Sequence, residues 1–160
     1  MKAAVEVTTP SERELRVTRV FDAPAKRVFE AHTKPEHVRK WLLGPPGWSM
    51  PVCEIDLKVG GRYHYMWRND ENGMEFGTRG EFREIVVPER IVHSERMEGL
   101  GHGPELPEAV GTLTLAEKDG RTTLTMSIRF ASQEIRDQAL KSGMTDGMAM
   151  SYDRLETMLG

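Results

Sequence analysis

Three ring-bearing residues alternate along one short segment, VGGRYHYMWR at residues 59–68. If this segment is a strand, Tyr63, Tyr65 and Trp67 share one face, because successive side chains of a strand point to opposite sides. Tyrosine and tryptophan carry polar tips that need partners when buried, whereas leucine, isoleucine and phenylalanine suit a dry interior. The set therefore predicts the wall of a small-molecule cavity. The alternative is that the rings only fill the space beneath a helix.

A second candidate is the pair His93 and Glu95 in the segment IVHSERM, residues 91–97. Both residues share a face with Ile91 if the segment is a strand. Pointing into a cavity, the pair could orient a ligand or move protons as an acid and a base. On a strand edge, the same residues would be hydrated polar groups without a chemical role.

Sharper catalytic signatures are absent from the sequence, including GxSxG, HExxH, GxxxxGK[ST] and GxGxxG. His32 and His37 are five residues apart across an expected helix break, a spacing that does not suit a metal site. The single cysteine, Cys53, has no second cysteine for a disulfide or a zinc pair. We therefore expect no metal, no cofactor and no catalytic residue, and an enzyme is the less favoured interpretation.

The composition of the chain limits the classes of partner that we expect. The chain has 160 residues, a net charge of −3 and a pI near 6.0, so it lacks the basic balance of a nucleic-acid-binding protein. No apolar stretch has the length of a membrane span or a signal peptide. We expect one domain over residues 1–160, with residues 1–12 a flexible segment, in a soluble cytoplasmic protein. A homodimer is compatible with this reading.

The candidate residues must be positioned by strands and short helices. Alternation predicts a strand over residues 14–21, followed by a short helix that Asp22 caps and a second that carries Trp41. The sequence GPPG at residues 44–47 ends the second helix. Six strands then follow between residues 50 and 130, and Asn72-Gly73 and Asp119-Gly120 have the composition of tight hairpin turns.

The last segment switches to helical spacing after Ser132, its expected cap. One apolar stripe runs along it through Leu140, Met144, Met148, Tyr152, Leu155 and Leu159. A single helix over residues 133–159 would be ~40 Å long and would cross a whole sheet. Gly143 and Gly147 lie inside it, where each costs about 1 kcal/mol relative to alanine, so we expect a close approach there. The elements together predict an α+β fold with a curved antiparallel sheet around this helix.

Four segments carry a family resemblance: VTRVFDAPAKRVFEAHTKPEHVRKWL, EIDLKVGGRYHYMW, GEFREIVVPERIVHSE and GMTDGMAMSYDRLETML. With the order of elements, they resemble the helix-grip superfamily, also called START-like, Bet v 1-like or SRPBCC. Within it, the chain is similar to the C-terminal domain of the activator of the heat-shock protein 90 ATPase. The resemblance implies the helix-grip fold. It is poorly specific for function, because the superfamily contains lipid and hormone carriers as well as polyketide cyclases and aromatases.

Two positions depart from that branch. Met148 stands where its members often carry tryptophan, and His93 where they often carry an aromatic residue. Both changes would alter the shape and polarity of a cavity. We expect its lining to consist of Trp41, Trp48, Tyr63, Tyr65, Trp67, Phe82, His93, Glu95, Met144 and Met148.

The favoured function is a module that binds an apolar or aromatic small molecule. The alternative is a cyclase-like or aromatase-like enzyme that uses a tyrosine, histidine or glutamate of the same cavity. A third reading, a protein that regulates a chaperone, rests on analogy alone.

Overall fold

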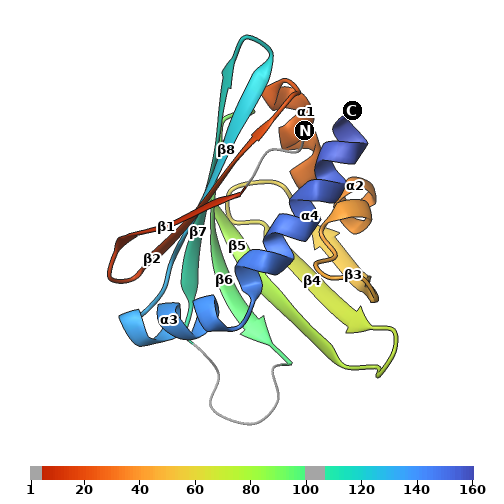
Figure 1. Ribbon diagram of the computed structural model, residues 1–160, viewed down its shortest axis with the longest axis vertical. Helices are drawn as coiled ribbons and strands as arrows, with labels where there is room; N and C mark the ends of the chain where they lie inside the picture. The colour runs from red at the N-terminus through yellow and green to blue at the C-terminus, as the bar shows by residue number, and fades with distance from the viewer. Residues whose placement is uncertain (1–4, 100–106) are drawn as a thin grey trace.

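The computed structural model of the protein describes residues 5–99 and 107–160. Eight strands in this part of the chain form one antiparallel sheet, in the order β1-β2-β8-β7-β6-β5-β4-β3 (Figure 1). The strands are β1 Glu6–Ser11, β2 Glu14–Phe21, β3 Trp48–Ile55, β4 Arg62–Asn69, β5 Glu75–Val86, β6 Arg90–Glu98, β7 Ala109–Lys118 and β8 Arg121–Arg129. The helices are α1 Ala25–Thr33, α2 Pro35–Trp41, α3 Gln133–Lys141 and α4 Met144–Leu159.

Helix α4 crosses one face of the sheet, and α1 and α2 lie beside its C-terminal half (Figure 1). The strict alternation of β2 and β8 explains which face this is. On β2, Leu15, Val17 and Phe21 are fully buried, and Leu124 and Ile128 are buried at the paired positions of β8. The polar residues between them point to the opposite face. The core therefore lies between the sheet and the helices, and the predicted α+β fold is confirmed.

The first helix does not begin as expected. Asp22 does not cap it; Pro24 occupies the capping position, and the N–H of the buried Ala25 donates to the Glu117 carboxylate at 2.7 Å. A carboxylate at a helix N-terminus satisfies an unpaired donor and interacts favourably with the helix dipole. Because Glu117 is on β7, sequence spacing around Asp22 could not reveal this contact.

The single C-terminal helix predicted over residues 133–159 is wrong. Two helices, α3 and α4, meet at Gly143, which adopts a left-handed conformation with φ 86°. Ser132 caps α3 as predicted, and its side chain accepts a hydrogen bond from the Ile135 N–H at 3.2 Å. The 16 residues of α4 span about 24 Å. The close approach expected at the two glycines is wrong: an added Cβ at Gly147 would be an ordinary 3.8 Å from Pro45, and one at Gly143 would meet no atom within 4 Å.

The N-terminal segment also differs from expectation. Residues 1–12 were predicted to be flexible, yet Glu6–Ser11 forms the edge strand β1, paired antiparallel with β2. Every residue of β1 is exposed, so no buried alternation marked it. The sequence EGLGHGPELPEA at residues 98–109 is rich in glycine and proline, as expected of a loop, and most of it lies outside the described residues.

Candidate functional site

The aromatic row of β4 lies on the face that α4 covers. Tyr63 is buried, with 4% of its surface exposed, whereas Tyr65 and Trp67 are half-buried. The ring centroids of Tyr63 and Tyr65 are 5.1 Å apart, and those of Tyr65 and Trp67 are 6.0 Å apart. Burial therefore decreases along the row, from the core toward the hairpin that joins β4 to β5.

Tyr63 has a structural role. Its hydroxyl donates to the Ser94 carbonyl on β6 at 2.7 Å, so the side chain reaches across the intervening strand β5. Gly80 on β5 makes this reach feasible, because a Cβ at that position would lie 2.8 Å from the Tyr63 ring. The hydroxyl is thus already paired inside the protein.

The three tryptophan side chains also make contacts within the protein. Trp67 donates its indole N–H to the Leu42 carbonyl at 2.7 Å, and Trp41 donates to the Ala31 carbonyl at 2.8 Å. Trp41 is 2% exposed and stacks on Tyr152, with centroids 5.9 Å apart, so it belongs to the core. Trp48 lies at the hairpin end, edge-on to Phe76 at 5.3 Å. Of the three, only Trp67 lies in the row with Tyr65.

His93 and Glu95 do form a pair. The His93 Nε2 is 2.9 Å from the Glu95 carboxylate, and the two side chains keep 13% and 23% of their surfaces exposed. The imidazole lies edge-on to Tyr63, with centroids 5.4 Å apart. Both residues extend over Gly111 on β7, where a Cβ would approach the His93 ring to 2.5 Å and Glu95 to 3.3 Å.

Two hydroxyls beside this pair lack partners among the described residues. Thr78 on β5 pairs across the strands with Tyr65; its buried Oγ1 lies near the Tyr63 hydroxyl but makes no hydrogen bond of 3.5 Å or shorter. The Tyr65 hydroxyl makes none within the described chain. Burial raises the pKa of Tyr63 and Tyr65, and the negative charge of Glu95 raises both further. Both phenols therefore stay protonated at neutral pH, which makes Tyr65 a potential hydrogen-bond donor.

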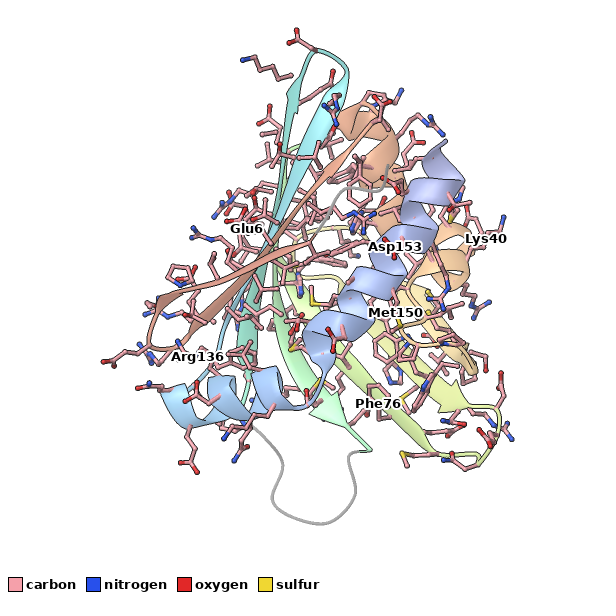
Figure 2. The ribbon with its side chains drawn as sticks, viewed as in Figure 1. Glu6, Lys40, Phe76, Arg136, Met150 and Asp153 are labelled. Atoms are coloured by element: carbon pink, nitrogen blue, oxygen red, sulfur yellow. The ribbon has the colours of Figure 1, made fainter. Side chains whose placement is uncertain are left out.

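The N-terminal half of α4 lies less tightly on the sheet than the C-terminal half. No residue from Met144 to Met150 is buried, whereas Tyr152, Leu155 and Leu159 are. Met148 packs against the core cluster and yet remains half-buried. On β8, Met126 is half-buried between two fully buried neighbours on the same face. Figure 2 labels Met150 on α4 and Phe76 on β5.

The C-terminal half of α4 is held by a buried arginine. Arg19 on β2 is 1% exposed, and its Nη1 is 2.7 Å from the carboxylate of Asp153 on α4. Its Nη2 is 3.4 Å from Glu156, one turn further along the helix. The Arg19 Nε and Nη2 have no hydrogen-bond partner, but neither atom has accessible surface. This group fastens the helix to the sheet and does not face an open space.

The structure thus brings together five predicted residues, Tyr63, Tyr65, Phe82, His93 and Glu95, with Trp67 at one side. Phe82 is buried, its ring 5.6 Å from that of Tyr63. Three further residues that were not predicted from the sequence lie in the same group: Thr78, Gly111 and Met126. Thr78 lies an even number of residues from Phe82 on β5, and Met126 lies an even number from Leu124 on β8. The alternation of side chains along a strand could therefore have assigned both to the covered face. Gly111 carries no such signal, because a glycine has no side chain to assign to a face.

An open depression of about 500 Å³ lies elsewhere, at the turn between β3 and β4, lined by residues between Glu54 and Arg62. It contains none of the predicted residues, and its Asp56–Lys58 ion pair is exposed. Among the described residues, no group of three or more histidine, cysteine or acidic side chains could hold a metal. Within the same part of the chain, no helix combines the length and apolarity needed to cross a membrane.

An antiparallel sheet wrapped around a C-terminal helix, with paired short helices after the strand that enters the core, defines the helix-grip class of proteins. The sequence profile of the family described as "Activator of Hsp90 ATPase homolog 1-like protein" matches residues 22–160. The chain belongs to this family. No curated protein matches it significantly.

Solved structures give the same assignment. A protein from Rhodobacter sphaeroides is 29% identical with a TM-score of 0.86, covering 98% of this chain and 97% of its own. A Mycobacterium smegmatis protein is 25% identical with a TM-score of 0.85, and the match covers 98% of each chain. A Chromobacterium violaceum protein is 27% identical with a TM-score of 0.79, covering 93% of this chain and 98% of its own.

Proposed function

We propose that the protein binds a small, largely apolar molecule between the N-terminal half of α4 and the sheet. One observation carries this proposal. Val17, Leu113 and Leu124 on the covered face of the sheet are buried. Tyr65 and Met126 on the same face are only half-buried, and so is Met148 on α4. Residues that point inward and still have accessible surface border space that water or a guest can enter.

The chemistry of this region suits a guest. Aromatic and methionine side chains supply an apolar, adaptable wall, and a few polar groups at defined places orient what binds there. Those groups are the Tyr65 and Thr78 hydroxyls and the His93–Glu95 pair. The buried Oγ1 of Thr78 is costly without a partner, and a guest or a water molecule would satisfy it.

Native mass spectrometry of protein purified from its own host tests the proposal directly, with a co-purified small molecule as the expected result. The variant Met148→Trp places a large ring in the same space, so we expect it to lose the guest while its thermal midpoint stays equal or rises. Met150→Trp is the matched control, because Met150 is 41% exposed on the same helix. Retention of the guest by Met148→Trp, or no guest in any preparation, would contradict the proposal.

One observation favours a second candidate, a cyclase-like enzyme. The His93 imidazole and the Glu95 carboxylate are within hydrogen-bond distance beside a tyrosine, as an acid–base pair requires. A His93→Gln variant separates the two functions. An enzyme would lose turnover and keep its affinity for the substrate, whereas a binding module would change only in affinity.

A further inference from the structure

The interior of the protein offers no free basic group to an anion. Two arginines are buried in the described part of the chain, and each is paired. Arg19 lies between the Asp153 and Glu156 carboxylates, and Arg136 bonds to Asp137 and to the Ser11 carbonyl. A carboxylate or phosphate entering beneath α4 would lose its hydration without gaining a counter-charge there, which is strongly unfavourable.

A negative charge is present there instead. Glu95 is 23% exposed, and within the described chain its one ion-pair partner is His93. The His93 Nε2 lies 2.9 Å from the carboxylate and is the one hydrogen-bond partner of the Glu95 side chain in that part of the chain. Among the described residues, no lysine or arginine lies within ion-pair distance of Glu95.

Aromatic rings lie next to the His93–Glu95 pair. Tyr63 contacts His93 edge-on at 5.4 Å, and Tyr65 and Trp67 continue the row with half-buried rings. The Tyr63 and Tyr65 centroids are 5.1 Å apart, which connects the pair to the row, and the Glu95 charge contributes to the raised pKa of both phenols. The faces of such rings attract cations, most strongly where water is excluded, and aromatic walls with an acidic residue suit ammonium groups.

We propose that the guest is an organic cation with an apolar body, whose ammonium group lies beside Tyr65 with Glu95 as its counter-charge. The oxygen of the Thr78 hydroxyl, buried on the next strand, adds a lone-pair dipole that favours a positive charge nearby. This inference rests on the proposed binding function, since it assigns the charge of the guest of that same site.

Three benzyl compounds of matched shape test the assignment: benzyltrimethylammonium, its uncharged carbon isostere neopentylbenzene, and phenylmethanesulfonate. Their affinities are measured by NMR titration of the labelled protein, following the Trp67 indole and the Gly111 amide. We expect the cation to bind at least about tenfold more tightly than the neutral compound, and the anion to bind least.

Glu95→Gln removes the charge and nearly keeps the shape. We expect it to lose most of the preference for the cation, while its affinity for neopentylbenzene stays unchanged and shows that the fold and the space persist. Glu98→Gln is the matched control, because Glu98 is on the same strand but on the opposite face, paired with His64. It should keep the preference.

The outcomes separate the two proposals. Equal binding of the cation and the neutral compound, tighter binding of the anion, or an unchanged preference in Glu95→Gln overturns the charge assignment and leaves the binding function standing. Absence of binding by all three compounds, together with no co-purified guest, overturns both.

Discussion

Gly111 determines where the polar pair of the site lies. The His93 ring and the Glu95 carboxylate extend over this position, and any side chain there would meet the ring at 2.5 Å. A contact that close requires the ring or the strand to move. The residue without a side chain is therefore as much a part of the site as the two residues with one.

Gly111→Ala should consequently displace the His93–Glu95 pair and lower the free energy of unfolding by about 1–3 kcal/mol, as overpacking does. Guest binding should fall with it. Urea denaturation and the NMR titration measure the two effects. Gly147→Ala serves as the control, because its Cβ would find no heavy atom nearer than 3.8 Å and alanine favours a helix interior. If Gly111→Ala is as stable as Gly147→Ala, the packing argument is wrong.

His32 on α1 makes stability depend on pH. Burial lowers its pKa from 6.5 to about 4, even though its Nδ1 contacts the Val28 carbonyl at 2.8 Å. The Nε2 is buried without a hydrogen-bond partner, and the ring packs edge-on against Trp41 at 4.7 Å. Protonation would place an unpaired charge in this apolar contact.

The unfolded chain therefore binds a proton at a higher pH than the folded one. Stability from this group is complete above pH 6.5 and declines as the pH falls toward 4, by up to about 3 kcal/mol. The free energy of unfolding, measured by urea denaturation across that pH range, should depend less steeply on pH in His32→Gln than in the wild type. His37→Gln, at a half-buried position on α2, should keep the wild-type slope. Parallel curves for the wild type and His32→Gln would exclude this origin.

At the scale of elements, one glycine divides the C-terminal helical segment. Gly143 has φ 86°, a region that costs residues with a Cβ about 1–2 kcal/mol. The break lets α3 pack near β2 while α4 takes a different direction across the sheet (Figure 1). The half-buried N-terminal half of α4 begins directly after this break.

Gly143→Ala is expected to lower the free energy of unfolding by about 1 kcal/mol, because alanine must adopt the left-handed conformation or the two helices must realign. Gly143→Asn should cost less, since asparagine tolerates that conformation better. Thermal or urea unfolding ranks the variants. The opposite order, with alanine the more stable, would indicate that a continuous helix is accommodated.

Across the molecule, the buried guanidinium of Arg19 connects the sheet to the helix that covers it. Arg19 is the only charged residue on the buried face of β2, and it reaches Asp153 and Glu156 on α4. The interaction of Arg19 with Asp153 and Glu156 holds the C-terminal half of α4 against the sheet. The N-terminal half of α4 covers the proposed site.

Asp153→Ala should therefore lower the free energy of unfolding by up to about 3 kcal/mol, because it removes the nearer of the two carboxylates that pair with the buried guanidinium and leaves only Glu156. Arg19→Met removes the charge itself and fills the space with an apolar chain, so we expect a smaller loss. Calorimetric midpoints of both variants give the comparison. A larger loss for Arg19→Met would show that the ion pair stabilises the fold more than apolar packing can.

Much of this architecture follows from local patterns. Alternation in β2 and β8 identified the buried face, the Asn72-Gly73 and Asp119-Gly120 turns predicted two hairpins, and Ser132 marked a helix start. The predictions that were wrong involve partners distant in the sequence. The cap of α1 comes from Glu117, and β1 is ordered by pairing with β2 although none of its residues is buried.

For the candidate site too, local patterns determine one part and contacts between distant segments determine the other. The residue types and their parity, by themselves, determined that Tyr63, Tyr65 and Trp67 share a face and that His93 and Glu95 do too, because strand geometry assigns faces locally. Only the tertiary structure decided which polar tips remain available. Tyr63 and Trp67 are paired with the carbonyls of Ser94 and Leu42, whereas Tyr65 and Thr78 are left without partners in the described chain. Hydrogen-bond satisfaction depends on contacts across strands and helices, and no local pattern encodes them.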